Sequence, residues 1–516
     1  MAEAQAEVIA FLSDGAGYGA PGGPVERIET HISIVFLVGE RAYKLKRAVR
    51  FSYVDYSTLA LRETYCRREL ELNRRSAPEL YLRVRAITHV PGGGLEFDGT
   101  GQAVDFVLEM RRFAQESLLD RLADCGGLTP GLMRDVTDTI AAFHEAAAAV
   151  PGFGGAAVMR AVIAGNAENL SRAAPLLDGA AAREVSEAAL VVLETMAPLL
   201  EARKAAGKVR RCHGDLHLRN ICLLEGKPLL FDCIEFNEAF SCIDVLYDLA
   251  FLLMDLLHRG FSAQANAVCN RYLDRTGDWG GVALLPLFIS MRAAVRAHVL
   301  VAQYCNILAA QTLAAARAYL ALAGRALVGR TPFLVAIGGL SGTGKSTVAA
   351  ALAGRFGPVP GARVIRSDVV RKMLSGVAPE VKLPATAYDV ETSARVYAAM
   401  WAQARAVLAA GCPVILDAAF LAAGMRAEAR ALAARAGVGF CGVWLQAPVA
   451  VLEARLAERR GDASDADVLV MRGQAVEGVV DWLVVDAAAG VEAQVERILD
   501  APLWGASREA VVRKML

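Results

Sequence analysis

The chain has 516 residues, more than a single hydrophobic core usually supports, so two or three domains are expected. Lys and Arg together number 55, as do Asp and Glu, and this net charge of zero provides no overall basic field of the kind that binds nucleic acid. No uninterrupted apolar run reaches the roughly 18 residues of a membrane span, and the N-terminus lacks the positive segment of a secretory signal. We expect a helix-rich cytoplasmic protein that acts on a small molecule, without nucleic acid or membrane partners. The oligomeric state is left open.

The ten cysteines are spread along the chain, and no two form a Cys-x-x-Cys pair. Metal-binding cysteines usually occur in closely spaced pairs, so buried reduced thiols are favoured over a zinc site. Four of the cysteines lie in apolar segments close together in the sequence: Cys212, Cys222, Cys233 and Cys242.

The N-terminal part of the chain has the pattern of a small mixed lobe. Residues 30–47 contain two β-rich runs on either side of Gly39-Glu40, which predicts a β-hairpin. Residues 59–78 follow with a helical pattern that Pro78 stops. Two further strands are predicted, at residues 80–90 and 103–113.

The pattern changes twice farther along the chain. Amphipathic, Ala- and Leu-rich helices dominate as far as residue 328, except in a segment at residues 209–236. From Pro332 onward, five continuous apolar runs alternate with helical stretches, which indicates a parallel sheet covered on both faces. The predicted domains are 1–328, with a small lobe of about 1–112 and a helical lobe of about 113–328, and 329–516.

Residues 339–346 read GLSGTGKS, which is the complete G-x-x-x-x-G-K-[ST] pattern of a phosphate-binding loop. The motif follows a predicted strand and precedes a predicted helix, as the function requires. Its backbone N–H groups can surround phosphates, Lys345 can neutralise them, and Ser346 can hold Mg²⁺. The expected nucleotide-binding residues are Gly339, Ser341, Gly342, Thr343, Gly344, Lys345, Ser346 and Thr347.

Two carboxylates end neighbouring strands of the predicted parallel sheet, whose strand ends converge on one crevice. Asp417 ends the run PVILD and is the candidate metal-organising acid. Asp368 ends RVIRSD on the same edge. A helix N-cap following the strand is the alternative role for each of the two. Arg371 lies one helical turn later, where it could bind an anionic acceptor or simply be solvated.

Residues 453–467 place Arg455 and Arg459 four apart on one helical face, with Arg460 adjacent, ahead of a polar loop. A solvated charged helix is the alternative to a functional role. Residues 331–516 as a whole resemble the zeta-toxin and gluconate-kinase-like branch of P-loop kinases. The resemblance implies that Asp368 orients or deprotonates the acceptor hydroxyl. It also implies that these arginines form a lid over the transferred phosphoryl group.

The segment HGDLHLRN contains a second nucleotide signature. Asp215 and Asn220 have the five-residue spacing of the catalytic base and the metal-binding Asn in kinases. Asp232 follows twelve residues after Asn220, behind the strand-like run KPLLF. These three residues in this order therefore predict a kinase-type catalytic loop.

HGDLHxxN is also the motif of aminoglycoside phosphotransferases and choline kinases, and residues 1 to about 325 resemble that family. The resemblance implies that Asp215 takes the acceptor's proton and that Asn220 and Asp232 bind Mg²⁺. It further implies that Asp248 supports the catalytic loop. The histidines of the motif would hold the loop by hydrogen bonds: His213 and His217.

The same resemblance implies a lysine on the third strand and a glutamate on the following helix. Lys44 fits, with Lys46 left open because it points to the same strand face. Glu69 is the expected partner and Glu63 the reserve. The segment around Glu109 and Met110 resembles the hinge that meets adenine through its backbone.

This half also departs from the family pattern. The glycine-rich turn above the phosphates is reduced to Gly39, and the upstream GYGAPG is better read as a flexible loop. Asp232 is followed by CIE, so Glu235 could join the metal site.

The two halves together resemble a bacterial bifunctional family that fuses an aminoglycoside-phosphotransferase-like domain to a P-loop kinase domain. The implied fold is an α+β bilobal kinase-like domain followed by an α/β domain with a doubly wound parallel sheet. The implied cofactors are ATP or GTP and Mg²⁺, and the implied reaction is phosphoryl transfer to hydroxyls of a sugar, aminoglycoside-like compound or related polyol. Two alternatives stay open. One half could regulate the other through nucleotide binding, or the P-loop half could be a toxin-like kinase restrained by the first.

Overall fold

The computed structural model describes residues 2–18, 24–51, 53–329, 332–355, 359–458 and 463–501. By compactness the chain divides into two units, one of Met1–Gly155 with Leu200–Leu252 and one of Ala156–Leu199 with Leu253–Leu516. The sequence-based boundary at residue 328 follows the change of sequence pattern, whereas compactness groups helices from the first half with the sheet of the second. That boundary therefore stays a prediction.

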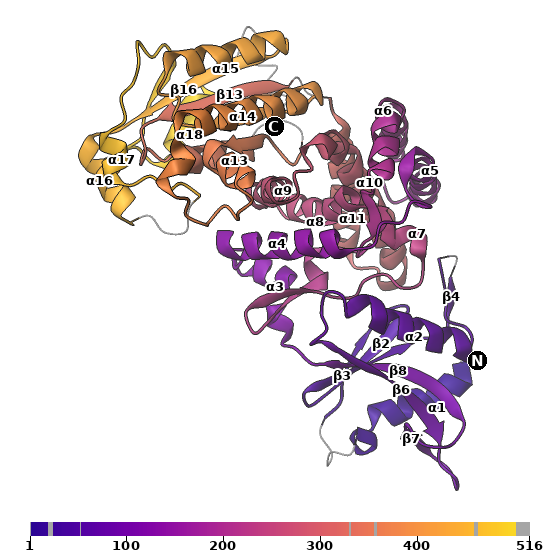
Figure 1. Cartoon of the computed structure of the whole chain (residues 1–516). Helices are drawn as coiled ribbons and strands as arrows, with labels where there is room; N and C mark the ends of the chain where they lie inside the picture. Colours follow the sequence, from indigo (N-terminus) through magenta and orange to yellow (C-terminus); the bar gives the residue numbers. More distant parts are fainter. Residues whose placement is uncertain are drawn as a thin grey trace. The chain divides into compact units, whose positions relative to one another are not determined.

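The first unit is built on a six-stranded antiparallel sheet in the order β1-β2-β3-β8-β6-β7 (Figure 1). The predicted hairpin is confirmed, because Val38 pairs with Arg41 across the two-residue turn. The strands are β1 (Glu26–Glu29), β2 (Ser33–Val38), β3 (Arg41–Lys46), β6 (Tyr81–His89), β7 (Leu95–Phe97) and β8 (Ala103–Arg111). A separate short pair is formed by β4 (Arg50–Phe51) and β5 (Val54–Asp55).

Helices α1 (Ala2–Ser13) and α2 (Leu59–Asn73) pack on opposite faces of this sheet. Phe36 and Leu45 belong to the core beneath α1, whereas Leu37 and Ala42 belong to the core on the α2 side. Side chains alternate along a strand, so Lys44 shares the face of Ala42 and is directed toward α2.

Helix α2 ends earlier than the sequence pattern suggests, at Asn73 rather than near Pro78. The N–H groups of Ser76 and Ala77 both bond back to the Asn73 carbonyl, at 3.1 and 2.8 Å. The residue before a proline avoids helical geometry, so this turn absorbs the last few residues of the predicted helix.

Short elements of the first unit frame the catalytic segment. The loop with the HGD motif runs between β9 (Val209–Arg211) and β10 (Ile221–Leu224), and Asp232 follows β11 (Lys227–Leu230). β10 pairs with β11, and β9 pairs with β12 (Cys242–Asp244). The surrounding helices are α3 (Leu119–Asp124), α4 (Pro130–Ala146), α7 (Glu238–Ser241) and α8 (Val245–His258), whose last residues belong to the second unit.

The second unit contains a five-stranded parallel sheet in the order β14-β15-β13-β16-β17. All five apolar runs identified in the sequence form these strands, which confirms the expected α/β fold. The strands are β13 (Phe333–Gly339), β14 (Arg363–Arg366), β15 (Val414–Asp417), β16 (Gly439–Gln446) and β17 (Leu483–Asp486).

Helices cover both faces of this sheet (Figure 1). Val335 and Ile337 of β13 share a core with α12 and α18, while the alternate residues Leu334 and Ala336 are fully buried toward the other face. The helices are α12 (Lys345–Ala353), α13 (Ser367–Leu374), α14 (Val390–Ala409), α15 (Ala423–Arg435), α16 (Val449–Glu458), α17 (Val468–Arg472) and α18 (Val491–Leu499).

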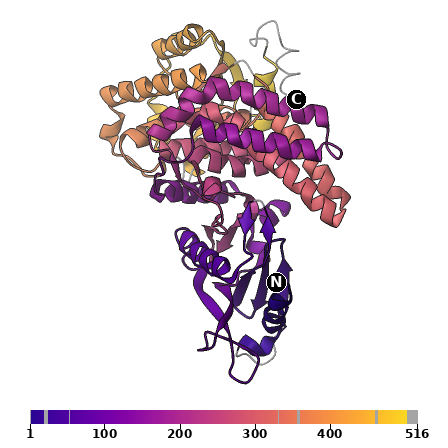
Figure 2. The same cartoon turned by 90° about the vertical axis from the view of Figure 1, so that its right-hand side faces the viewer.

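The second unit also includes helices from the first half of the sequence. They are α5 (Gly155–Ala173), α6 (Gly179–Ala205, whose last residues belong to the first unit), α9 (Ser262–Thr276), α10 (Leu285–Ile307) and α11 (Ala310–Leu327). Figure 2 shows α5 and α6 as two long magenta helices side by side, and Arg160 and Glu194 form a 2.6 Å ion pair between them.

One helical stretch, Trp279–Cys305, is long and apolar enough to cross a membrane, with a mean hydropathy of 1.5 in its most apolar window. In the structure 67% of that window is buried. A stretch that is buried to this extent is a core helix of the second unit.

Candidate active sites

The catalytic loop of the first unit brings Asp215, His217 and Asn220 together. Asn220 Nδ2 donates to Asp215 Oδ2 at 3.0 Å and to the Asp215 carbonyl at 2.9 Å. His217 Nε2 lies 3.3 Å from the same carboxylate oxygen. The Asp215 side chain is 35% exposed, so its carboxylate is both oriented by the loop and open to a substrate hydroxyl.

Asp248 of α8 supports the loop through hydrogen bonds, as expected. Its buried carboxylate accepts the backbone N–H groups of His213 at 2.9 Å and Gly214 at 2.8 Å. Gly214 has a φ of +90°, and a Cβ there would lie 2.9 Å from the Phe240 carbonyl. A third support, which no local sequence pattern predicts, is His144 of α4, whose Nε2 lies 3.0 Å from Asp248 Oδ2.

Lys44 connects the small-lobe sheet to the carboxylate that follows β11. Its Nζ donates to Glu69 Oε1 at 2.7 Å and to Asp232 Oδ1 at 2.6 Å. Burial opposes the charge of Lys44, but Asp232 and Glu69 raise its pKa well above the ordinary value. Glu63, the reserve partner, instead pairs with Arg67 on the surface at 2.8 Å. The geometry therefore favours Lys44 with Glu69 for the role that the resemblance implies.

Lys46, the other candidate lysine, lies in a buried network beside this pair. Its Nζ donates to Glu69 Oε2 at 2.5 Å and also to Glu235. Tyr56 OH donates to Glu235 Oε1 at 2.5 Å, and Glu235 is only 5% exposed. Glu235 is thus a partner of Lys46, and its possible place in the metal site is not supported.

Glu69 is held by both lysines, and this has a consequence for acid stability. Burial would raise the pKa of Glu69, but Lys44 and Lys46 lower it to about 2. Stability from a carboxylate with a lowered pKa is present above its ordinary value of 4.5 and is lost as the pH falls toward 2. We expect Glu69→Gln to lower the free energy of unfolding near pH 7 by about 3–5 kcal/mol, because two buried ammonium groups lose their shared partner. The variant should also have a flatter acid dependence between pH 4.5 and 2, measured by urea unfolding.

A matched control is Glu63→Gln, which removes an exposed pair with Arg67 and should cost less than about 1 kcal/mol. A Glu69→Gln chain with the acid dependence of the wild type would contradict this reading of the pair.

Asn220 and Asp232 offer the oxygen ligands that Mg²⁺ prefers. Asp232 has a left-handed φ of +65°, its N–H is held by Tyr81 OH at 3.0 Å, and its carboxylate is 43% exposed. Asn220 uses its NH₂ group toward Asp215, which orients the amide. This donor set fits a magnesium site next to the base.

The two expected hinge residues occupy different environments on β8. Met110 joins an apolar cluster with Ala42, against which Leu229 packs. The Glu109 carboxylate is bound by Arg83 at 2.8 Å, and Glu109 lies between Tyr43 and Arg83 in the sheet. The structure thus brings Met110, but not the Glu109 side chain, toward the Lys44 face of the sheet. Adenine contact through the backbone here stays a prediction.

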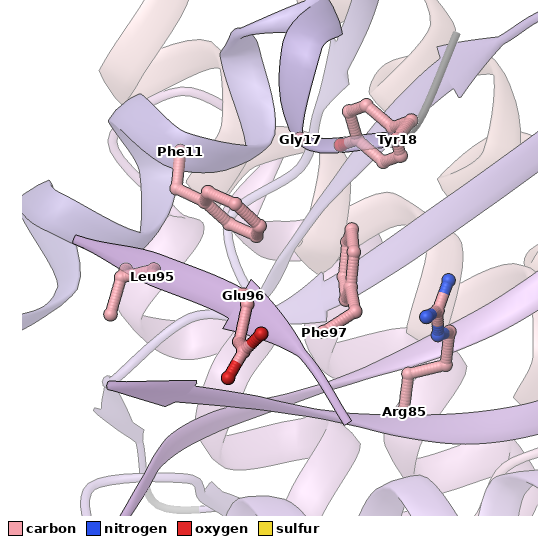
Figure 3. A pocket seen from close by; sticks show the side chains of 7 residues that line it. All are labelled: Phe11, Gly17, Tyr18, Arg85, Leu95, Glu96 and Phe97. Atoms are coloured by element: carbon pink, nitrogen blue, oxygen red, sulfur yellow. The ribbon is translucent and has the colours of Figure 1, made fainter. Parts of the chain in front are cut away.

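A hollow of about 460 Å³ lies on the α1 side of the small-lobe sheet (Figure 3). Phe97 is one of its lining residues, with its ring stacked on Tyr43 at a centroid distance of 5.7 Å and the Arg85 guanidinium 4.3 Å from its ring centre. The hollow is lined by Phe11, Gly17, Tyr18, Arg85, Leu95, Glu96 and Phe97. None of these lining residues is expected in the kinase site. The upstream GYGAPG overlaps this lining at Gly17 and Tyr18, and its remaining residues lie outside the described part of the chain.

In the second unit, the phosphate-binding loop joins β13 to α12 with the geometry its motif predicts. Gly339, Gly342 and Gly344 have φ values of +143°, +89° and +83°, and a Cβ on Gly339 would lie 2.5 Å from the Leu445 carbonyl. Lys345 Nζ bonds the carbonyls of Gly339 at 2.9 Å and Leu340 at 3.0 Å. The Lys345 side chain thus folds back over the phosphate-binding loop, where it is expected to bind the phosphates.

The remaining loop residues differ in their exposure. Thr343 is buried, and its Oγ1 donates to the Leu340 carbonyl at 2.8 Å. Thr347 is exposed in the first turn of α12. Ser341 donates its N–H to Gln474 Oε1 at 2.8 Å and its Oγ accepts from Gln474 Nε2 at 3.0 Å. Gln474 follows α17 and was missed in the sequence, because no local pattern links it to the loop.

The structure brings together Ser346 and Asp417, the two residues expected to hold a metal ion in the P-loop half. Ser346 Oγ donates to Asp417 Oδ2 at 2.6 Å, and Arg366 Nε lies 3.3 Å from the same oxygen. Burial raises the pKa of Asp368, with Asp417 adding to the effect. A hydroxyl and a carboxylate fit Mg²⁺, while the raised pKa of Asp368 suits a group that takes a proton.

Arg371 is neither solvated nor open to an acceptor in this structure. It is 7% exposed, donates to the Ala387 carbonyl at 2.6 Å and lies over the Tyr388 ring at 4.6 Å. Next to it, buried Lys372 bonds Asp465 Oδ2 at 2.6 Å. Asp465 also accepts from Tyr388 OH at 2.5 Å, so the loop before α17 is tied to the segment that follows α13.

Of the predicted lid arginines, Arg455 on α16 lies close to the phosphate-binding loop. Its Nη1 would lie 3.8 Å from a Cβ on Gly344, and its Nη2 donates to the Ala487 carbonyl at 2.9 Å. Arg459 and Arg460 lie outside the described residues, so their place in the lid stays a prediction.

Comparison with known proteins finds a match in each half of the chain. The Phosphotransferase enzyme family model matches residues 65–285, and the AAA domain model matches residues 334–476. Uncharacterized proteins of Mycobacterium tuberculosis (Rv2004c) and Mycobacterium bovis (Mb2027c) are 31% identical over 465 residues, covering 88% of this chain and 90% of each relative. The chain belongs to the family of these mycobacterial proteins. In this two-module family member, an aminoglycoside-phosphotransferase-like domain is fused to a P-loop kinase domain, as the motifs predicted.

Two solved structures are similar to parts of this family member. A gluconokinase from Sinorhizobium meliloti is 23% identical, with a TM-score of 0.26, and covers 36% of this chain and 98% of its own. A choline/ethanolamine kinase family protein from Mesorhizobium loti is 16% identical, with a TM-score of 0.38, and covers 63% of this chain and 95% of its own. From the family matches, the protein is a nucleotide-binding kinase with an alcohol group as its acceptor.

Proposed function

We propose that both modules of the chain are ATP- and Mg²⁺-dependent kinases, each transferring the γ-phosphoryl group to a hydroxyl of a small molecule. The observation that carries the proposal is that each module has its own complete set of groups. Lys44, Asp215 and Asp232 serve the first, and Lys345 and Asp417 serve the second. A sugar, an aminoglycoside-like compound or a related polyol fits as acceptor, because such molecules present hydroxyls.

In the first module, Asp215 takes the proton of the acceptor hydroxyl as the oxygen attacks the γ-phosphorus and ADP leaves. Asn220 and His217 hold the carboxylate in place, at 3.0 and 3.3 Å. Asn220 and Asp232 would hold Mg²⁺, which when bound neutralises charge on the phosphates. Lys44, fixed by Glu69, bonds Asp232 and adds positive charge beside it.

In the second module, Lys345 and the loop amides bind the phosphates. Asp368 is the group that takes the acceptor's proton, since burial raises its pKa. Ser346 and Asp417 would hold the metal ion, and Arg455 lies close enough to the loop to bind the transferred group. The cytoplasmic location and the small-molecule partner expected from the sequence belong to the same proposal.

The test is an acceptor screen on the full-length protein. A metabolite extract is incubated with γ-labelled ATP and Mg²⁺, and new phosphorylated species are identified by mass spectrometry. We expect one class of products to disappear with Asp215→Asn and another with Lys345→Met. Products that still form when the two substitutions are combined in one chain would contradict the assignment of these two sites.

Removal of the metal gives an independent check on both modules. We expect EDTA to abolish labelled product formation and excess Mg²⁺ to restore it, because oxygen-only ligand sets bind Mg²⁺ reversibly. Ca²⁺ at the same concentration should restore much less transfer, because Ca²⁺ has longer ligand distances and a more variable geometry. Full turnover in EDTA would argue against metal-assisted transfer.

A further inference from the structure

The edge of the parallel sheet at β14 is covered by side chains of helix α9. An edge strand exposes unpaired backbone N–H and C=O groups. Asn270 Oδ1 accepts from the N–H of Val364 at 2.8 Å. Asn270 Nδ2 and Asn266 Nδ2 both donate to the Ala362 carbonyl, at 3.1 and 3.0 Å. Two asparagines thus replace the neighbouring strand that this edge lacks.

The same face of α9 also neutralises a buried cation of β14. Arg363 is 4% exposed, pairs with Asp274 and donates to Asn270 Oδ1 at 3.0 Å. Asn266, Asn270 and Asp274 are each four residues apart, which places them in one row on the helix. The row contacts three successive residues at the start of the edge strand, Ala362 just before β14 and then Arg363 and Val364 within it.

Two glycines of the P-loop half allow the close approach of α9. Gly361 has a φ of +110°, and a Cβ there would lie 2.8 Å from Asn266 Nδ2. A Cβ on Gly354 would lie 3.2 Å from the Cα of Ala263. Asn266 also donates to the Pro360 carbonyl at 3.1 Å. Helix α9 therefore approaches the backbone at Gly354 and Gly361 so closely that larger side chains would not fit at either position.

Strand β14, which α9 contacts, leads directly to the two aspartates of the P-loop site. β14 ends at Arg366, which lies 3.3 Å from the Asp417 carboxylate, and Asp368 follows two residues later on α13. Arg366 at the site lies only three positions after Arg363, which α9 holds. A shift of the strand edge would therefore move Arg366, which contacts the metal-organising Asp417, and Asp368, the group proposed to take the proton.

We propose that α9 is an edge clamp of the P-loop kinase, and that Asn270 and Asp274 are positioning residues for Arg366 and Asp368. The inference rests on the proposed kinase activity of the P-loop module. Helix α9 lies within the segment matched by the Phosphotransferase enzyme family, residues 65–285. The phosphotransferase-like module thus supplies a helix that positions residues of the P-loop active site. The P-loop site therefore requires the fusion of the two modules.

The test uses the full chain with Asp215→Asn, so that only the P-loop site turns over ATP. Asn270→Ala is compared with Asn169→Ala, a half-exposed asparagine on α5. We expect amide hydrogen exchange in residues 362–372 to rise at least about tenfold in Asn270→Ala alone. We expect kcat for Lys345-dependent turnover to fall about tenfold, with KM for ATP within about twofold, because the phosphate-binding loop lies on β13 and α12.

Two further variants separate positioning from loss of folding. Asn270→Asp keeps the acceptor for Val364 and Arg363, so it should recover most of kcat. Asp274→Leu leaves Arg363 buried and unpaired, whereas adding Arg363→Met removes both charges and should restore the melting temperature. A merely structural helix would change the melting temperature without changing kcat per folded molecule.

Exchange and kcat equal to those of the Asn169→Ala control would overturn the proposal. So would a loss of kcat that is fully explained by a smaller folded fraction. If the Asp215→Asn chain shows no Lys345-dependent turnover, the proposed function of the P-loop module fails. Exchange in residues 366–372 then decides the clamp: faster exchange in Asn270→Ala supports it and unchanged exchange refutes it.

Discussion

Replacing Asp215 with asparagine should lower phosphoryl transfer by the first module at least about 100-fold, because an amide cannot take the proton of the acceptor hydroxyl. The substitution keeps the shape of the side chain and its contact with Asn220, 3.0 Å away, so the loop should hold its conformation. The measurement is labelled product formed by a Lys345→Met chain, in which the second module is silent. KM for ATP should change little, since Asp215 is not among the groups proposed to bind nucleotide.

The matched control for this variant is Asp135→Asn, an exposed aspartate on α4 whose side chain is 58% exposed. It should retain wild-type transfer. An Asp215→Asn chain that keeps a tenth or more of its activity would mean that another group accepts the proton, and His217 would then be the next residue to test.

Replacing Lys345 with methionine should lower transfer by the second module about 100- to 1000-fold, as expected for the loss of a charge that stabilises the transferring phosphoryl group. Methionine has a similar length, so the loop geometry set by its three glycines should survive. The measurement is labelled product from the Asp215→Asn chain. Lys382→Met, an exposed lysine of the same half, is the control and should have no effect.

A loss confined to KM for ATP, with kcat unchanged, would show that Lys345 only binds nucleotide. Transfer unaffected by Lys345→Met would remove the second module from the proposed enzyme and favour the alternative that this half is a regulator.

The parts of the fold that local pattern decides were predicted well. The hairpin around Gly39 follows from alternation and turn residues, and the five strands of the parallel sheet follow from their apolar runs. The phosphate-binding loop is likewise local, since its function needs glycines at fixed spacing next to a lysine. Alternation also placed Lys44 and Lys46 on one face, and only the structure could show which of them bonds Asp232.

The supports of the two sites depend on long-range contacts and left no local signal. His144 reaches Asp248 from 104 residues away, and Gln474 reaches Ser341 from 133 residues away. The residues on α9 looked like ordinary polar positions of an amphipathic helix. Nothing in a helix sequence states that its polar face pairs with the edge of a sheet, so the clamp on β14 appears only in three dimensions.

One feature makes the first module harder to judge from the sequence than the second, namely its reduced glycine-rich turn. Gly39 alone was expected to stand above the phosphates, which suggested a weak nucleotide site and kept the regulatory alternative open. The structure nevertheless has the Lys44–Glu69 pair beside Asp232, which is the arrangement that a catalytic kinase needs. This geometry supports the proposal that the first module is itself a kinase.

The stoichiometry of nucleotide binding tests the two-site proposal without knowledge of any acceptor. Isothermal titration of the full chain with a non-hydrolysable ATP analogue and Mg²⁺ should give two molecules bound per chain. Asp232→Ala and Lys345→Met should each reduce this number to one, and the double variant should bind none. A single molecule bound per wild-type chain, lost completely with either substitution, would contradict the proposal that the protein carries two independent kinase sites.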